Sequence, residues 1–231
     1  MTDLAKKLKK NSPSLGSIFF LLILLLSTAV LSNQLFNLNS SNHETSFFFT
    51  RIAIWFCLLF VYMYAIIIEK RPLLLWKEKK YALGFYIKSI ISTMLVLILV
   101  VFALSLTFKL ADSNIDSEKM KVLVQVFKKN RLLLVFTCLT AGITEEIIFR
   151  GYLLPRLEIL LKNKNLSVII SSIFFGLIHY GYGTSIQIIG PILIGLVFGV
   201  HYQKYRNIKI LIICHFLWDL IALLVKTGQT Q

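Results

Sequence analysis

Residues 132–151 read LLLVFTCLTAGITEEIIFRG. The run has the length and the apolar character of a membrane span, because a helix needs about 20 apolar residues to cross the hydrocarbon core. It nevertheless ends on two adjacent glutamates, Glu145 and Glu146, followed by Arg150. Ionisable groups inside a membrane segment are costly, and they usually mark a site with a function. The stretch therefore predicts a membrane helix that carries a polar site at its end.

Further apolar runs surround this stretch along the whole chain. Of the 231 residues, 57% are hydrophobic, which exceeds the 45–50% or so of soluble domains and predicts an all-α, polytopic membrane helix bundle. The expected spans, about seven transmembrane helices, are Leu15–Leu31, Ile52–Ile68, Ser89–Phe108, Leu132–Phe149, Ser167–Tyr180, Ile186–His201 and Ile208–Val225. The length favours a single membrane domain, residues 1–231, with N-terminal helices in 13–130 and a polar core in 131–226.

The formal net charge of +14 gathers mainly in the segments between the apolar runs. Clustered Lys and Arg are typical of cytoplasmic loops that face anionic lipid, so we expect membrane lipid and no nucleic acid as a partner. The lysines among residues 6–10 predict a multi-pass protein of the cell membrane with a cytoplasmic N-terminus. Residues 112–131 are an exception, because they should lie outside yet carry five cations. Either these residues form an interfacial amphipathic segment, or the expected number of helices is wrong by one.

Small side chains inside the apolar runs predict packing rather than chemistry. The three cysteines, Cys57, Cys138 and Cys214, lie in apolar surroundings and form neither a disulfide framework nor a metal-binding motif. Gly195 and Gly199 are four residues apart on the expected sixth helix. This spacing lets two membrane helices approach each other closely.

The two glutamates of the quoted stretch are expected to have different surroundings. Glu146 and Arg150 are four residues apart, with the acid first, which favours an ion pair along one helix face. Glu145 points about 100° away and is left without a local partner. A desolvated carboxylate of this kind suits a general base or acid near neutral pH. Alone, the motif also fits a structural clamp at a helix end.

Two later helices carry histidines at the spacing of one helical turn from a second residue. Phe175 and His179 form one pair, and His215 and Asp219 form the other, in which the carboxylate orients the imidazole. Together with Glu145, the two histidines allow either of two chemistries. The glutamate activates a water while the imidazoles stabilise an oxyanion, or the three side chains bind a divalent metal such as zinc.

Each histidine pair is, by itself, also typical of helix packing or of an interfacial position. The unpaired Glu145 and the two histidines occupy three different late helices, and this coincidence favours a common interior site. The expected depth of His179 in the membrane does not fit a common site. The topology places His179 toward the outer end of its helix, whereas Glu145 and His215 lie about 10 Å away along the membrane normal, at 1.5 Å per residue.

In this order, the three motifs resemble the CPBP family of intramembrane proteases, which joins CAAX proteases and bacteriocin-processing enzymes and is also called the Abi family. The resemblance covers roughly residues 130–225. It implies catalytic roles for Glu145, His179, His215 and Asp219 and supporting roles for Glu146, Arg150 and Phe175. Many relatives have Asn where this chain has Asp219, and an ionised Asp cannot donate a hydrogen bond to an oxyanion.

The resemblance implies a hydrolase that cleaves a membrane-associated protein or peptide, such as a prenylated CAAX protein, a bacteriocin precursor or a pheromone. Family members have been described both as metal-dependent and as glutamate proteases. The first alternative is a non-catalytic immunity or scaffold protein of the same fold. A proton-coupled transporter is the second, because buried ionisable groups also mark ion pathways.

Overall fold

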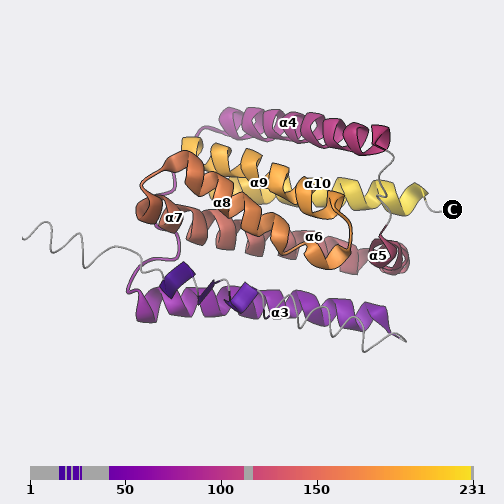
Figure 1. Ribbon diagram of the computed structural model, residues 1–231, viewed down its shortest axis with the longest axis horizontal. Coiled ribbons are helices and arrows are strands. Elements are labelled where there is room, and N and C mark those ends of the chain that lie inside the picture. The colour runs from indigo at the N-terminus through magenta and orange to yellow at the C-terminus, as the bar shows by residue number, and fades with distance from the viewer. Residues whose placement is uncertain are drawn as a thin grey trace, which may run out of the picture.

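The computed structural model describes residues 16–18, 20, 21, 23–25, 27, 42–111 and 117–229 (Figure 1). All regular elements within these residues are helical. In chain order they are α3 (His43–Met63), the π-helix η1 (Tyr64–Ile68), α4 (Leu83–Leu110), α5 (Glu118–Lys129), α6 (Arg131–Glu146), the π-helix η2 (Ile147–Leu153), α7 (Leu154–Leu161), α8 (Lys164–Leu177), the 3-10 turn η3 (Tyr180–Tyr182), α9 (Ile186–Tyr205) and α10 (Ile208–Gln229).

Six helical segments of the described residues are long and apolar enough to cross a membrane. They are His43–Ile68, Leu83–Leu110, Arg131–Leu161, Lys164–Tyr182, Ile186–Tyr205 and Ile208–Gly228. The prediction of an all-α polytopic bundle is confirmed. The first expected span, Leu15–Leu31, is described only in part.

Two spans extend well beyond the expected limits, one at its capped start and the other at its end. α3 starts at His43 instead of Ile52, since the Asn42 side chain accepts a hydrogen bond from the Thr45 backbone at 3.2 Å. Asn130 caps α6 in the same way, at 2.9 Å from the Leu133 nitrogen. Such caps satisfy backbone N–H groups at the first turn. The second span continues from α6 through η2 and α7 to Leu161, so Glu145 and Glu146 lie in the middle of a longer helix.

The helix α5 covers most of residues 112–131, the positively charged region that did not fit the expected topology. Its 12 residues cover only about 18 Å, which is too short to cross a membrane. One face is buried against the bundle through Leu123 and Phe127, whereas Lys121 and Lys128 are exposed on the other. The interpretation of this region as an amphipathic segment is therefore confirmed.

Close helix packing through glycines holds the centre of the bundle together. A Cβ atom added to Gly195 would lie 3.0 Å from the Ser172 Cα atom of α8, and one added to Gly199 would lie 2.8 Å from Val168 Cγ1. The predicted packing face on α9 is thus confirmed. Gly142 on α6 serves the same purpose against α10, because its Cβ would lie 3.0 Å from the Ile212 carbonyl oxygen. Figure 1 shows α8 beside α9, and α6 and α10 deeper in the bundle.

The outer surface and the interior differ as expected for a membrane bundle. Large apolar side chains such as Leu99 and Phe102 of α4 are exposed, which is typical of helices that face lipid. Cys57, Cys138 and Cys214 are buried thiols. They pack as small hydrophobic side chains, as the sequence predicted.

A buried ion pair joins the loop after η1 to the span that carries the glutamates. The Arg156 guanidinium, which is fully buried, donates from Nε to Glu69 Oε2 at 2.9 Å and from Nη1 to the Leu73 carbonyl oxygen at 3.1 Å. The Tyr152 hydroxyl donates to Glu69 Oε1 at 2.8 Å. Burial raises the pKa of Glu69, but the hydrogen bonds and the charge of Arg156 outweigh it and lower the pKa overall.

Candidate active site

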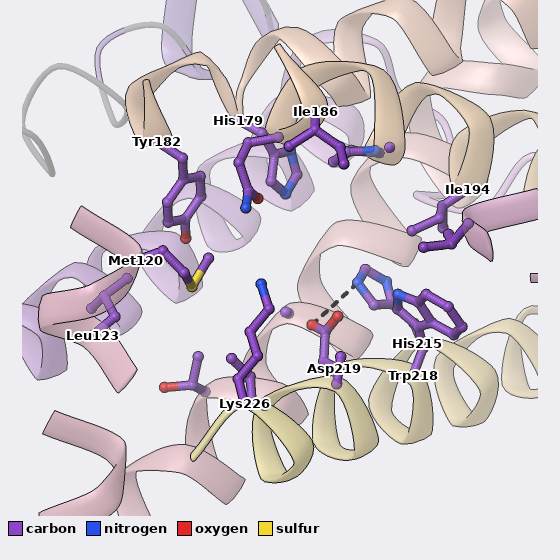
Figure 2. A pocket seen from close by; sticks show the side chains of 18 of the residues that line it. Met120, Leu123, His179, Tyr182, Ile186, Ile194, His215, Trp218, Asp219 and Lys226 are labelled. Atoms are coloured by element: carbon purple, nitrogen blue, oxygen red, sulfur yellow. Dashed lines mark ion pairs between the residues drawn. The ribbon is translucent and has the colours of Figure 1, made fainter. Parts of the chain in front are cut away.

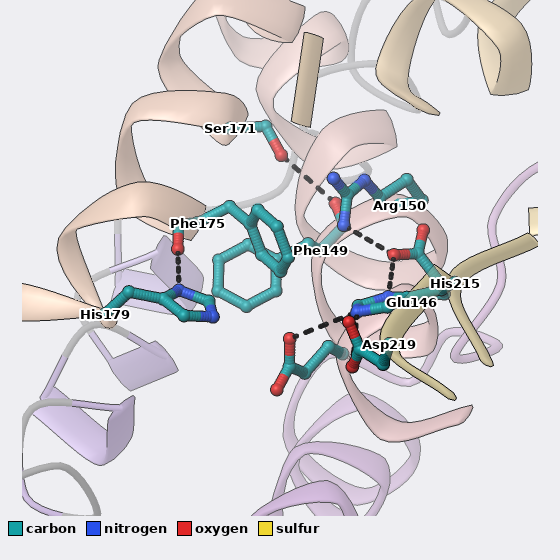
Figure 3. Close-up of polar contacts among 9 residues, drawn as sticks. Glu146, Phe149, Arg150, Ser171, Phe175, His179, His215 and Asp219 are labelled. Atoms are coloured by element: carbon teal, nitrogen blue, oxygen red, sulfur yellow. Dashed lines mark hydrogen bonds and ion pairs between the residues drawn. The ribbon is translucent and has the colours of Figure 1, made fainter. Parts of the chain in front are cut away.

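Glu146 lies at the centre of a buried polar network (Figure 3). Its Oε1 atom accepts hydrogen bonds from Arg150 Nη1 and from His215 Nδ1, each at 2.8 Å. All three side chains are almost completely buried. The predicted ion pair between Glu146 and Arg150 is therefore confirmed. The network also connects α6 and η2 with α10, because His215 belongs to α10.

The Arg150 guanidinium has an aromatic partner as well as an acidic one. Its carbon lies 4.3 Å from the centre of the Phe175 ring and 5.4 Å from that of Phe198. Cations over aromatic faces gain electrostatic energy when water is excluded. Arg150 sits in the π-helical segment η2, a type of helix irregularity that is frequent at functional sites.

Glu145 faces another direction, as the helical geometry predicted. Its carboxylate is not part of the Arg150 ion pair, and its Oε2 atom lies 4.0 Å from His215 Nε2. Glu145 is 9% exposed and lines a cavity within the bundle. It is therefore a desolvated carboxylate with access to a space that can hold a substrate or water.

His179 is held in one orientation by the end of α8. Its Nδ1 lies 2.8 Å from the Phe175 carbonyl oxygen, which can only accept, so the hydrogen is on Nδ1 (Figure 3). In the neutral ring Nε2 then carries the lone pair and can accept a hydrogen bond from water. The Phe175 ring packs edge-on against the imidazole, with ring centres 5.2 Å apart. Phe175 thus contacts both His179 and the buried Arg150.

His215 is oriented mainly by Glu146 and not by Asp219. The hydrogen bond from Nδ1 to Glu146 is 2.8 Å long, whereas Nε2 and Asp219 Oδ2 are 3.5 Å apart, beyond the usual range for N–H···O contacts. The sequence pointed to Asp219 because it lies one turn away on the same helix. Glu146 takes this place because close packing at Gly142 brings α6 against α10.

The cavity has a volume of about 420 Å³ and combines the candidate catalytic side chains (Figure 2). Glu145, His179, His215 and Asp219 all line it, together with Phe175. Glu146 and Arg150 are not among the lining residues and support the wall from behind. The expected difference in depth therefore does not separate His179 from the other groups, since α8 ends at Leu177 and the chain turns at His179 beside the cavity.

Two basic side chains in the cavity wall were missed by the sequence analysis. Arg51 comes from α3 and Lys226 from α10. Lys226 follows Asp219 by seven residues, which is the spacing of two helical turns, so the helical period could have shown that they share a face. Nothing in the local sequence of Arg51 indicates that α3 approaches the same cavity.

The side chains as they lie do not fit a metal ion. Within residues 42–111 and 117–229 and the described positions near the N-terminus, no group of three or more His, Cys, Asp or Glu side chains could hold one. In the set Glu145, His179 and His215, Nδ1 of each ring is held by a hydrogen bond, which leaves Nε2 as the atom that each imidazole offers to the cavity. The steps proposed below are therefore written for protein groups alone.

Comparison with known proteins agrees with this geometry. Residues 127–221 match the family model of type II CAAX prenyl endopeptidase Rce1-like proteins. The resemblance to the CPBP and CAAX protease family is thereby confirmed, and this segment relates the chain to membrane endopeptidases of the CAAX type. The matched residues include all three motifs. No curated protein sequence and no solved structure matches the chain.

Proposed function

We propose that this protein is an intramembrane endopeptidase that hydrolyses a peptide bond in a membrane-associated protein or peptide. The observation that carries the proposal is that Glu145, His179 and His215, from three separate apolar spans, line one cavity inside the bundle. The family match supports the reaction class. Candidate substrates are CAAX-like proteins and precursors of bacteriocins or pheromones.

In the proposed reaction Glu145 is the general base. Its carboxylate takes a proton from a water molecule, and the water oxygen attacks the carbonyl carbon of the scissile bond. His179 positions this water by accepting a hydrogen bond at Nε2, because its Nδ1–H is already donated to the Phe175 carbonyl. The apolar side chains around the cavity keep the number of competing waters small, which strengthens the electrostatic interactions there.

The tetrahedral intermediate carries a negative charge on the former carbonyl oxygen. His215 Nε2 faces the cavity side of the ring, so a hydrogen on this atom can donate to the oxyanion while Nδ1–H remains bound to Glu146. Collapse of the intermediate breaks the C–N bond, and the proton held by Glu145 passes to the leaving amine. The products are a new carboxylate and a new amine, and the base is regenerated.

Comparative peptidomics tests the proposal. Membranes and medium are compared between cells that produce the wild type and cells that produce Glu145→Gln at equal levels, since Gln keeps the size but cannot accept the proton. We expect processed peptides to disappear and precursors to accumulate. Loss of a general base should lower kcat/KM on a purified substrate by roughly 10²–10⁴-fold.

Glu118→Gln is the matched control, because Glu118 is exposed on α5 and does not line the cavity. It should leave the peptides unchanged. Identical peptidomes for wild type and Glu145→Gln, combined with a biological effect that persists in both, would reject the peptidase and favour the immunity or scaffold alternative.

A further inference from the structure

The amphipathic helix α5 has a basic face that is turned away from the bundle. Lys121, Lys128 and Lys129 are exposed on it together with Gln125, at intervals of one and two helical turns. Within α5 the only acid is Glu118, which lies 2.8 Å from Lys121. Exposed ion pairs of this kind contribute little to stability. The face therefore presents a net positive charge to its surroundings.

The orientation of α5 places this face at the border of the membrane. In Figure 1 the spans run across the picture, whereas α5 is seen end-on where α3 and α6 begin and α10 ends. The span Arg131–Leu161 starts directly after α5. Lipid headgroups lie at the level where apolar spans begin and end. The helix α5 therefore lies parallel to the membrane plane at the level of the headgroups.

The arrangement of the three lysines favours a lipid surface over a single anionic ligand. From Lys121 to Lys129 they extend over roughly 12 Å along the helix axis, so they do not surround one point. None of them lines the cavity. A row of cations on one helix face is complementary to a layer of anionic phospholipid headgroups, which offers many separate charges in one plane.

The opposite face of α5 forms part of the cavity wall. Met120, Leu123 and Phe127 line the cavity (Figure 2). The Phe127 ring also packs edge-on against Phe47 of α3, with ring centres 5.3 Å apart. A displacement of α5 would therefore open this end of the cavity to water.

The first residues of α5 also hold the turn that carries His179. The Ser117 hydroxyl donates to the Tyr182 carbonyl oxygen at 2.5 Å, and Lys119 Nζ donates to the Gly181 carbonyl oxygen at 3.2 Å. The Tyr182 ring is stacked on the His179 imidazole, with ring centres 6.1 Å apart. These contacts couple the position of α5 to the orientation of the imidazole that positions water in the proposed reaction.

We propose that anionic phospholipid headgroups bind the basic face of α5 and thereby hold the cavity wall and the turn 179–183 in place. Lipid binding is independent of the reaction, whereas its consequence for catalysis rests on the proposed peptidase function. Each basic side chain near an anionic surface contributes roughly fivefold in affinity. In neutral lipid α5 leaves the bundle more often, and His179 then loses its fixed orientation.

Hydrogen exchange followed by mass spectrometry tests the binding without any need for activity. Glu145→Gln protein is compared in nanodiscs of phosphatidylcholine and in nanodiscs of equal parts phosphatidylcholine and phosphatidylglycerol. The turn is informative because the amides of His179, Tyr182 and Gly183 are hydrogen-bonded to backbone carbonyls. We expect exchange in α5 and in the turn to be roughly ten- to a hundredfold slower in the anionic nanodiscs, and exchange in α9 to be unchanged.

Charge replacement shows which surface is responsible. Replacement of the three α5 lysines by Gln should abolish the difference between the two lipids, whereas replacement by Arg should retain it. The matched control removes the same charge from the exposed loop before α4, through Lys77→Gln, Lys79→Gln and Lys80→Gln. This control should leave the lipid effect on α5 intact.

Two replacements of Ser117 separate lipid binding from its effect on the turn. The Ser117 hydroxyl also accepts a hydrogen bond from the Met120 backbone nitrogen and so caps α5. Ser117→Asp keeps an acceptor for the cap but has no donor for the Tyr182 carbonyl, whereas Ser117→Asn has both. In Ser117→Asp the anionic lipid should still slow exchange in α5 but not in the turn, and Ser117→Asn should behave as the wild type. Equal slowing of both segments in Ser117→Asp would overturn the coupling.

Cleavage by the wild type in the same nanodiscs tests the consequence for the site. The value of kcat/KM should rise with the phosphatidylglycerol content in the wild type and should not respond to it after replacement of the α5 lysines by Gln. A rise of equal size in that variant would overturn the link between α5 and the site.

The exchange data distinguish failure of this proposal from failure of the peptidase. Equal exchange of α5 in both lipids would overturn the proposal whether or not the protein cleaves peptides. Slower exchange in anionic lipid without cleavage in either lipid would support the lipid-binding face and reject the peptidase. Exchange that ignores the lipid, combined with a loss of cleavage only for acidic substrates when the α5 lysines are replaced, would assign the face to a protein partner and overturn the proposal.

Discussion

Glu145 and Glu146 are neighbours in the sequence but have different roles in the structure. Glu146 accepts hydrogen bonds from Arg150 and His215 and lies behind the cavity wall, whereas Glu145 lines the cavity. A buried charge that loses its partner is strongly destabilising, because its desolvation is no longer compensated. At the scale of single residues, Glu146 should therefore matter for folding and Glu145 for the reaction.

A double-mutant cycle tests the structural role of Glu146. We expect Glu146→Gln to lower the free energy of unfolding by about 3 to 5 kcal/mol, because it leaves the Arg150 charge buried and uncompensated. Arg150→Met alone should also destabilise. The double variant should lose clearly less than the sum, since Met can pack against the Phe175 ring. Unfolding by SDS in mixed micelles gives the values, and additive losses would contradict the prediction.

Asp219→Asn tests how far His215 depends on its neighbour one turn away. Glu146 already binds Nδ1 of His215, so the ring should keep its orientation in the variant. The Asn amide also offers a donor to the oxyanion, which an ionised Asp does not. We expect kcat/KM to stay within about tenfold of the wild type on a substrate from the peptidomic comparison. A loss of a hundredfold or more at unchanged stability would show that the carboxylate itself is needed.

At the scale of helices, the site depends on the close contact between α6 and α10. Gly142 precedes Glu146 by one turn, and α10 approaches it with backbone atoms of Ile212 and Phe216. Backbone atoms in a helix cannot move aside as a flexible side chain can. The absence of a side chain at Gly142 is therefore what lets the Glu146 carboxylate reach His215.

Gly142→Ala should separate the two helices. The new Cβ would lie 3.0 Å from the Ile212 carbonyl oxygen and 3.1 Å from the Phe216 nitrogen. We expect a loss of about 1 to 3 kcal/mol in the free energy of unfolding, together with reduced activity. Gly84→Ala is the control, because a Cβ there meets nothing within 4 Å and should be neutral or slightly stabilising. Equal behaviour of the two variants would contradict this account of the contact.

At the scale of the whole molecule, the pair of Glu69 and Arg156 connects the N-terminal helices with the segment that carries the site. The sequence analysis placed a division near residue 130, and this pair joins the two parts across it. Glu69 is nearly buried and is held by Arg156 and Tyr152. The position of α3, which supplies Arg51 to the cavity, therefore depends on an ion pair between Glu69, directly after the first span, and Arg156 near the end of the span Arg131–Leu161.

The stability contributed by Glu69 should depend on pH. Its pKa is lower in the folded protein than in the unfolded chain, where a glutamate titrates near about 4.3. The contribution is thus complete above the unfolded pKa and is lost as the pH falls through the folded one. We expect Glu69→Gln to lower Tm at pH 7, and the difference from the wild type to shrink below about pH 5. Glu118→Gln, at an exposed site, should show little difference at either pH, and a constant difference for Glu69→Gln would contradict the prediction.

The sequence by itself determined the class of fold, the motifs and the local pair of Glu146 and Arg150. These features depend on apolar composition and on the helical period, which act between residues close in the chain. It also identified the cavity-lining Glu145, His179 and His215, because ionisable groups are rare in apolar helices. The ends of the spans were less predictable, since caps such as Asn42 allow a helix to continue through polar residues.

Only the tertiary structure decided which groups meet across helices. The hydrogen bond of His215 goes to Glu146 at 2.8 Å, whereas the ion pair with Asp219 is longer at 3.5 Å, and Arg51 reaches the same cavity as Lys226. These contacts result from the way α3, α6 and α10 pack, which depends on glycine contacts and buried ion pairs between distant parts of the chain. The helical period of one segment holds no information about such contacts. Composition and spacing therefore determined which residue types form the site, and helix packing determined which of them are partners.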